Sequence, residues 1–252
     1  MTSAPFRPTA VILAAGLGAR LRSVQPDEPK GFVVVGEGAI IARSLRLLRA
    51  AGVHDLVLVA GWREEVYRAF LARHHPAARL VINRDYATTG SLASLVLGAR
   101  GAAGDVLVVE SDLLYEYRAL TALLAAPGRN TLLASGPTGS GDEVWVYGRG
   151  GRLAHLGKGA WAGAPRLGEL VGLTRLSGEL AQALIAAASG LPASAHYEDG
   201  INAVCPRHAI EVLRLDDLAW CEIDDGGHLA RARQSVWPRI QAAERAAEGI
   251  RP

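Results

Sequence analysis

Lysine is scarce in this 252-residue sequence and occurs only at positions 30 and 158. The remaining 25 of the 27 basic residues, 27 minus these 2, are arginine. In a chain that uses arginine almost everywhere, a retained lysine indicates a position that needs a compact ammonium rather than a planar guanidinium. The alternative is chance retention. Lys30 and Lys158 are therefore candidate site residues.

Cysteine is equally scarce, because the chain has only Cys205 and Cys221, far apart and without metal-ligand spacing. This usage excludes a disulfide scaffold and favours ordinary buried thiols in a reducing compartment. The formal net charge of +2 gives no electrostatic footprint for a polyanion, so we expect no nucleic-acid partner. Any cations that matter must act locally.

Long apolar runs are also missing from the first ten residues. We therefore expect neither a signal peptide nor a membrane span, and a cytoplasmic location. Half of the residues are hydrophobic, enough for one sizeable core, so we predict a single domain over 1–252. Its halves would be about 8–130 and 131–252. The oligomeric state does not follow from the sequence, and a homodimer is one candidate.

The first half alternates short apolar runs with amphipathic stretches, which is typical of βαβ units on a mainly parallel sheet. The predicted elements are strands at 11–15, 56–60, 80–83 and 106–110, and helices at 40–51, 64–74, 91–100 and 119–124. The run Val106–Val109 is apolar throughout, as in a strand buried on both faces. This half therefore predicts a sheet covered by helices.

In the second half, glycine-rich segments separate short predicted strands. We predict strands at 131–135, 143–147, 152–156 and 218–223, and helices at 178–188 and 228–241, the latter kinked at Pro238. The predicted fold class is α/β: a Rossmann-like, mainly parallel mixed sheet with helices on both faces, plus a small antiparallel extension.

A glycine-rich turn follows the first strand, where Leu13-Ala-Ala-Gly-Leu-Gly-Ala-Arg20 lets backbone N–H groups approach phosphate oxygens. Arg20 and the Pro29-Lys30 pair add positive charge. A P-loop does not fit, because it requires Gly-Lys-Ser/Thr after the first glycine and four residues. A dinucleotide fingerprint needs a small residue at 21, where Leu21 stands, although Glu37 lies at a suitable distance for a ribose carboxylate.

The complete pattern Leu-Ala-Ala-Gly-x-Gly-x-Arg, an interval and Pro-Lys resembles the signature of the nucleoside-diphosphate-sugar pyrophosphorylase-like nucleotidyltransferases. The alternative is a simple strand-to-helix turn. The resemblance implies a GT-A-like form of the predicted fold and binding of a triphosphate at this turn. The predicted phosphate-binding residues are Leu13, Ala14, Ala15, Gly16, Gly18, Arg20 and Lys30.

Three carboxylates are candidate metal ligands. Asp112 follows a buried strand at the edge where open α/β sheets bind ligands, although an aspartate there can instead cap a helix. Glu222 and Asp224 lie two apart on one face of the last strand, where they repel each other unless a cation sits between them. The alternative is a solvated acidic turn. We predict Mg²⁺ at Asp112, Glu222 and Asp224, assisting in-line attack on the α-phosphorus.

Further segments narrow the resemblance to the phosphocholine and 2-aminoethylphosphonate cytidylyltransferase-like group. They are Asn83-Arg-Asp-Tyr86, Thr89-Gly-Ser-Leu-Ala-Ser-Leu95, Glu110-Ser-Asp112, Ser135–Val144, Gly157-Lys158, Gly168–Gly172, His196-Tyr-Glu198 and Glu222-Ile-Asp-Asp225. The resemblance implies transfer of CMP from CTP to a small phosphonate or phosphate monoester. Our first candidate for the acceptor is 2-aminoethylphosphonate.

The resemblance also assigns roles. Gly90, Ser91 and Ser94 would lie near the nucleotide, although Ser91 also suits a helix cap. Lys30, Asp112, Lys158 and Asp224 would be catalytic, with Lys158 on the acceptor's phosphonate. The acceptor's cationic end would meet Tyr197 and Glu198, with Glu169 or Asp142 in reserve.

The acceptor is the least determined part. A phosphocholine site calls for an aromatic cage, to which Trp145, Trp161 and Tyr197 could contribute, although Trp145 also fits simple packing. A primary ammonium instead needs carboxylates such as Asp142, Glu143 and Glu198. Two further functions compete with a cytidylyltransferase, namely a sugar-1-phosphate nucleotidyltransferase and a non-catalytic nucleotide-binding regulator. The three acids argue against the regulator.

Overall fold

The computed structural model describes residues 8–249. The expectation about an N-terminal targeting segment was made on the first ten residues, and residues 1–7 lie outside the described part. Between residues 8 and 249, no helix is both long and apolar enough to cross a membrane.

The main sheet contains nine strands. They are β1 (Thr9–Ala14), β4 (Asp55–Ala60), β5 (Arg79–Ile82), β6 (Val106–Glu110), β8 (Thr131–Ser135), β9 (Trp145–Arg149), β10 (Arg152–Gly157), β11 (Arg166–Leu176) and β12 (Glu211–Leu215). Two short pairs stand apart from the main sheet. They are β2 (Val34–Val35) with β3 (Gly38–Ala39), and β7 (Leu113–Tyr115) with β13 (Trp220–Glu222).

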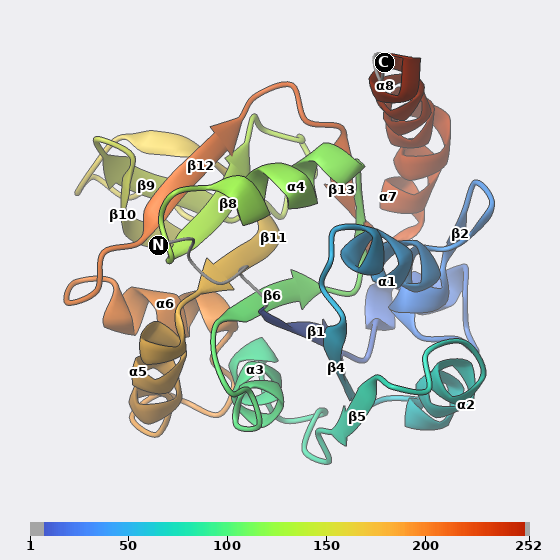
Figure 1. Ribbon diagram of the computed structural model, residues 1–252, viewed down its shortest axis with the longest axis horizontal. Helices are drawn as coiled ribbons and strands as arrows, with labels where there is room; N and C mark the ends of the chain where they lie inside the picture. Colours follow the sequence, from blue (N-terminus) through green and yellow to red (C-terminus); the bar gives the residue numbers. More distant parts are fainter. Residues whose placement is uncertain (1–7, 250–252) are drawn as a thin grey trace, which may run out of the picture.

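The helices lie between the strands and at the carboxyl end of the chain (Figure 1). The α-helices are α1 (Ile40–Ala50), α2 (Glu64–His74), α3 (Ser91–Ala99), α4 (Tyr117–Ala125), α5 (Gly178–Ala188), α6 (Tyr197–Val204), α7 (Gly226–Arg231) and α8 (Trp237–Gly249). Shorter turns are the 3₁₀ segments η1 (Ala19–Ser23) and η2 (Lys30–Phe32) and the π segment η3 (Ala232–Val236).

The strand order is β5-β4-β1-β6-β11-β8-β12-β10-β9, and β9 also pairs with β11. The strands β5, β4, β1 and β6 are parallel, as predicted for the first half. Beyond β6 only β8 and β12 are parallel, and the five strands from β11 to β9 close into a ring. The α/β class is confirmed. The predicted small antiparallel extension is instead a closed, barrel-like part of the main sheet.

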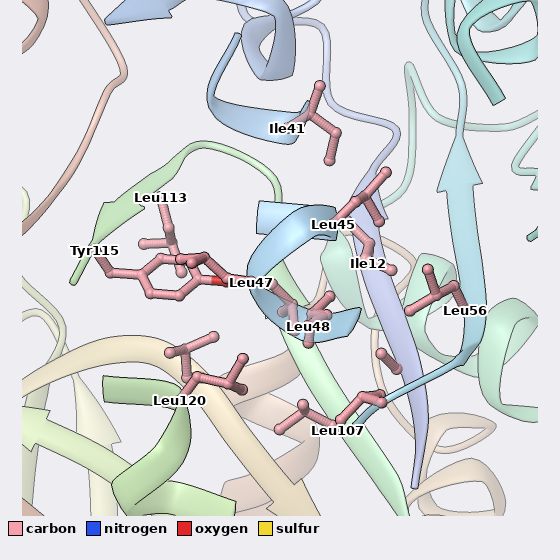
Figure 2. Close-up of a cluster of buried hydrophobic side chains, with 14 of the residues drawn as sticks. Ile12, Ile41, Leu45, Leu47, Leu48, Leu56, Leu107, Leu113, Tyr115 and Leu120 are labelled. Carbon is pink, nitrogen blue, oxygen red and sulfur yellow. The ribbon is translucent and has the colours of Figure 1, made fainter. Parts of the chain in front are cut away.

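Helices cover both faces of the sheet, as Figure 1 shows. On one face, α1 and α4 enclose a core around Ile12, Leu107 and Leu120 (Figure 2). On the other face, α3, α5 and α6 pack over a second core. This layering follows from strands that are apolar on both sides.

A third buried cluster joins the glycine-rich turn to the end of β13. Leu21 and Val33 lie near Arg20 and Lys30, and they share this cluster with Cys221 and Ile223, which flank Glu222. Both cysteines are free, as expected; Cys221 is buried and Cys205 is half-buried. Burial raises the pKa of the Cys221 thiol to about 12. The cluster fixes two candidate site segments relative to each other.

Several predicted elements differ from the structure. The strands β11 and β12 and the helix α6 were not predicted. The helix predicted over 228–241 runs from α7 through the π segment η3 into α8, and Pro238 is the second residue of α8. The irregularity predicted at Pro238 is therefore the π segment that directly precedes α8.

Candidate functional site

A cavity of about 620 Å³ opens at the carboxyl ends of β1 and β6. Most residues predicted for the site line it. These are Leu13, Ala14, Ala15, Gly16, Arg20, Lys30, Gly90, Ser91, Ser94, Asp112, Asp142, Lys158, Glu198, Glu222 and Asp224. Gly18, Glu169 and Tyr197 are not among the lining residues. Residues from distant parts of the chain thus share one concave site.

The glycine-rich turn runs from the end of β1 into η1. Gly18 adopts a left-handed φ of 59°, and a Cβ atom there would lie 2.8 Å from Cγ of Lys30. Gly16 is different, because a Cβ added to it meets nothing within 4 Å. Gly18 is therefore required by the backbone and by Lys30, whereas Gly16 leaves the cavity open.

Lys30 begins η2 directly after Pro29. Its Nζ lies 3.1 Å from Oδ2 of Asp112 and also contacts Oδ1 of Asp224. Burial alone would lower the pKa of this ammonium, but the charges of the two aspartates outweigh burial and raise the pKa above its ordinary value. Lys30 is thus held in its charged form by both acids.

Asp112 and Asp224 meet because β7 pairs with β13. The pairing is antiparallel, and the Ile223 N–H donates to the Asp112 carbonyl at 3.0 Å. Asp112 lies in the turn between β6 and β7, so the helix-cap alternative is wrong. Asp224 is 5% exposed, so a solvated turn does not describe it, whereas Asp225 caps α7.

The arrangement of the acids bears on the magnesium prediction. In the part of the chain that the structure describes, no three His, Cys, Asp or Glu side chains form a metal-binding cluster. Asp112 Oδ1 is nevertheless buried without a hydrogen-bond partner, and Asp112 and Asp224 converge on one cation. Two carboxylates suit Mg²⁺, which takes its other oxygens from phosphates and water. These two residues fit the ion, and its presence remains a prediction.

Glu222 and Glu110 are half-buried acids that line the same cavity as these two aspartates. Burial, followed by the charges of Asp112 and Asp224, raises the pKa of Glu222 well above its ordinary range. Burial and the charge of Glu222 do the same for Glu110. Glu110 lines the cavity but was not among the predicted site residues. In the sequence it is the carboxylate that ends a continuous apolar strand. Glu222 lines the same cavity as Asp112 and Asp224, and its role as a third metal ligand stays a prediction.

The candidate base-contacting residues at α3 are held in place by residues of other segments. Ser94 Oγ accepts a hydrogen bond from Asn83 Nδ2 at 3.1 Å. Ser91 Oγ accepts from the Tyr197 N–H at 3.0 Å and does not cap α3, whose N-cap is Gly90. A Cβ at Gly90 would lie 2.1 Å from the Ala195 carbonyl oxygen. The predicted Ser91 cap is therefore wrong, and Ser91 instead ties α3 to α6.

On the acceptor side, Lys158 follows β10 and contacts Asp142. Asp142 also lies 2.9 Å from Arg20, so two cations share one carboxylate. Glu198 has a buried Oε2 without a hydrogen-bond partner among the described residues, and burial raises the pKa of its carboxyl. Glu198 is thus a carboxylate with free bonding capacity on the cavity.

Glu169 and Tyr197, which were predicted to bind the acceptor, do not line the cavity and contact other residues of the protein instead. Glu169, on β11, accepts hydrogen bonds from Thr138, including one from the hydroxyl at 2.9 Å. Tyr197 is 1% exposed, and its hydroxyl lies beside Glu110 and Thr174. The structure therefore assigns them to supporting positions.

The suggested aromatic cage does not form at the cavity. The Arg166 guanidinium lies 3.9 Å from the ring centroid of Trp145. Trp161 stacks on His155 with ring centroids 4.8 Å apart. Neither tryptophan, nor Tyr197, is among the lining residues.

Residues 10–251 match the profile of the MobA-like NTP transferase domain. The chain belongs to the MobA-like NTP transferase family. This confirms the predicted nucleotidyltransferase class at the level of the family. In solved structures, the fold is similar to the CTP:phosphocholine cytidylyltransferase of Streptococcus pneumoniae, with a TM-score of 0.74 and 21% identity over 91% of this chain and 99% of that one.

The curated relatives match over part of their length. The CMP-5'-(3-aminopropyl)phosphonate synthase of Streptomyces rubellomurinus is 31% identical over 239 residues, which is 88% of this chain and 38% of that protein. The 2-aminoethylphosphonate cytidylyltransferase of Lancefieldella rimae is 29% identical over 60% of this chain and 61% of its own length. The choline-phosphate cytidylyltransferase of S. pneumoniae is 30% identical over 42% of this chain and 46% of its own length. In sequence, the chain thus spans less than two thirds of each of these curated relatives.

Proposed function

We propose that this chain transfers CMP from CTP to a small aminoalkylphosphonate and releases pyrophosphate, with 2-aminoethylphosphonate as the first acceptor to test. The proposal rests on the combination of groups that line one cavity. They are the glycine-rich turn, the cations Arg20 and Lys30 with their carboxylate partners, and Glu198 with Lys158. Family membership supports the reaction type.

In this proposal the triphosphate lies at the glycine-rich turn. The open space over Gly16 admits phosphate oxygens, and Arg20 and Lys30 supply positive charge. The residues at the start of α3, with Ser94 and Asn83 lining the same cavity, offer polar groups to the base. The preference for CTP rests on the family resemblance and on the names of the relatives.

Asp112 and Asp224 would hold Mg²⁺. When bound, that ion would neutralise charge that develops on the phosphate oxygens. The chain's own residues position the reactants. An oxygen of the acceptor attacks the α-phosphorus of CTP, the bond from that phosphorus to the bridging oxygen breaks, and pyrophosphate leaves.

The acceptor would lie between Lys158 and Glu198. Lys158 would bind the phosphonate, and the unpartnered Oε2 of Glu198 would accept a hydrogen bond from the primary ammonium. Two relatives carry aminoalkylphosphonates in their names. The absence of Trp145 and Trp161 from the described lining favours this acceptor over phosphocholine, whose quaternary ammonium calls for an aromatic cage.

The test is a matrix of nucleotides and acceptors, with pyrophosphate release as the measurement. CTP, UTP, ATP and GTP are each combined with 2-aminoethylphosphonate, 3-aminopropylphosphonate, phosphocholine and a sugar 1-phosphate, with Mg²⁺ present. We expect turnover with CTP and an aminoalkylphosphonate. Absence of turnover with CTP and every acceptor would overturn the proposal, and a preference for phosphocholine or the sugar 1-phosphate would replace its acceptor.

A further inference from the structure

The loop 136–144 between β8 and β9 reaches the cavity through Asp142. The two oxygens of this carboxylate contact different cations, since Oδ2 lies 2.9 Å from Arg20 and Oδ1 contacts Lys158. Arg20 comes from the glycine-rich turn, whereas Lys158 follows β10. The position of this loop therefore determines whether the two cations share one carboxylate.

His228 contacts the same loop at Ser140. Its buried ring accepts a hydrogen bond at Nδ1 from the Asp224 N–H at 3.3 Å, and its Nε2 lies 3.3 Å from the Ser140 carbonyl oxygen. Because Nδ1 faces a donor and Nε2 faces an acceptor, the ring proton belongs on Nε2. A neutral imidazole in this tautomer satisfies both contacts.

These contacts form a closed circuit. Arg20 lies 3.3 Å from the Asp224 carboxylate as well as 2.9 Å from Asp142. Two residues before Asp142, the carbonyl oxygen of Ser140 contacts the ring of His228. The same ring accepts a hydrogen bond from the main-chain N–H of Asp224. His228 is therefore the one side chain in this circuit that joins the loop to the strand end carrying Asp224 without itself lining the cavity.

We propose that His228 is a positioning residue that holds the 136–144 loop so that Asp142 orients Lys158 and Arg20. The catalytic consequence of this role rests on the proposed function, whereas the structural consequence does not. Glu169 and Arg231 hold the same loop at Thr138. Loss of His228 would therefore free only the Ser140 end of the loop, next to Asp142, and weaken the contact of Asp142 with Lys158. The effect should fall on acceptor binding more than on CTP binding, because Lys30 keeps its own contacts.

Two substitutions separate the two ring contacts. His228→Gln places an amide near Nε2 and can still donate to the Ser140 carbonyl, whereas His228→Asn places an amide oxygen near Nδ1 and keeps only the Asp224 contact. If His228 acts by holding the loop, Gln should preserve function and Asn should behave like Ala. His75→Gln is the matched control, since this half-buried histidine lies outside the cavity lining.

The first readout uses the scarcity of lysine. Amine-reactive labelling followed by mass spectrometry resolves Lys158 from Lys30, the only other lysine. The ion pair with Asp142 occupies the amine and should slow its labelling. We expect His228→Ala and His228→Asn to accelerate Lys158 labelling several-fold, with the Lys30 rate, the His228→Gln variant and the control unchanged. This measurement does not depend on the enzymatic activity.

The second readout is steady-state kinetics with varied acceptor and varied CTP. We expect His228→Ala and His228→Asn to raise the KM for the acceptor about tenfold, with a smaller change in the KM for CTP, and His228→Gln to stay near wild type. Unchanged Lys158 labelling in His228→Ala, or equal behaviour of the Gln and Asn variants, would overturn the positioning role. Altered labelling in a protein without cytidylyltransferase turnover would instead overturn only the proposed function.

Discussion

The ammonium of Lys30 lies 3.1 Å from the carboxylate of Asp112. Lys30 also contacts Asp224, so one cation balances both carboxylates predicted to hold a metal ion. Its side chain is 21% exposed, against 18% for Asp112 and 7% for Asp224. Removal of one partner from an ion pair that is screened this little leaves an uncompensated charge.

Lys30→Gln should therefore destabilise the protein. The substitution leaves two mostly buried carboxylates without their cation, which costs about 3 kcal/mol in the free energy of unfolding. Urea denaturation measures this change. Mg²⁺ should raise the melting temperature of the variant more than that of the wild type, because a divalent ion can replace the lost charge between Asp112 and Asp224.

The chain supplies a matched control in Lys158→Gln. The Lys158 side chain is 62% exposed, so its ion pair with Asp142 is screened by solvent, and we expect a change of under about 1 kcal/mol. Equal destabilisation by the two substitutions would contradict the charge-balancing role of Lys30. An equal response of wild type and Lys30→Gln to Mg²⁺ would contradict the predicted metal site.

The first half of the fold was predictable because its strands are apolar runs and its helices have clear periodicity. The strand β11 was missed because Gly168 and Gly172 interrupt it and because it buries Glu169, Thr174 and Arg175, which hide its pattern. The ring closure of the sheet was also missed. It depends on the pairing of β9 with β11, for which the local sequence offers no signal.

The candidate site was predictable where one short segment forms it, as in the glycine-rich turn. Asp112 and Asp224 were found as separate strand ends, but their contact depends on the pairing of β7 with β13, which local patterns do not specify. His228 was missed for a related reason. Its two partners are main-chain groups of Asp224 and Ser140, and a main-chain contact cannot be recognised from residue types.

Asp112→Asn should abolish turnover and leave the fold intact. The amide keeps the shape of the side chain and removes the charge that would hold a metal ion, so we expect kcat to fall about 10³-fold or more. Circular dichroism and urea denaturation check the fold. Asp217→Asn is the control, because that side chain is 79% exposed. Retained activity in Asp112→Asn would show that the metal assignment is wrong.

Glu198→Gln should change how stability depends on pH. Burial raises the pKa of the Glu198 carboxyl in the folded protein above its unfolded value. The folded state therefore binds the proton more tightly, and stability falls as pH rises from the unfolded pKa through the folded one. Glu198→Gln removes this loss and should be more stable than wild type at pH 8, by about 1 kcal/mol. Urea denaturation between pH 4 and 8 tests this, and a constant difference across that range would contradict it.

The same substitution should weaken acceptor binding. A glutamine oxygen still accepts a hydrogen bond, but it lacks the charge that would pair with the acceptor's ammonium. We expect the KM for 2-aminoethylphosphonate to rise about tenfold, with the KM for CTP nearly unchanged. Methylphosphonate, which has no ammonium, is the diagnostic acceptor. If Glu198→Gln impairs both acceptors equally, Glu198 does not bind the ammonium.

Gly16→Ala should weaken ligand binding, whereas Gly18→Ala should lower stability. At Gly18 the φ of 59° and the 2.8 Å approach of Lys30 both oppose a Cβ, so alanine should lower the free energy of unfolding by more than about 1 kcal/mol. At Gly16 nothing lies within 4 Å of an added Cβ, so stability should change little. The added methyl would instead project into the space proposed for phosphate oxygens. Calorimetric titration with CTP should then show weakened binding to a normally folded Gly16→Ala variant, and unchanged CTP affinity there would place the triphosphate elsewhere.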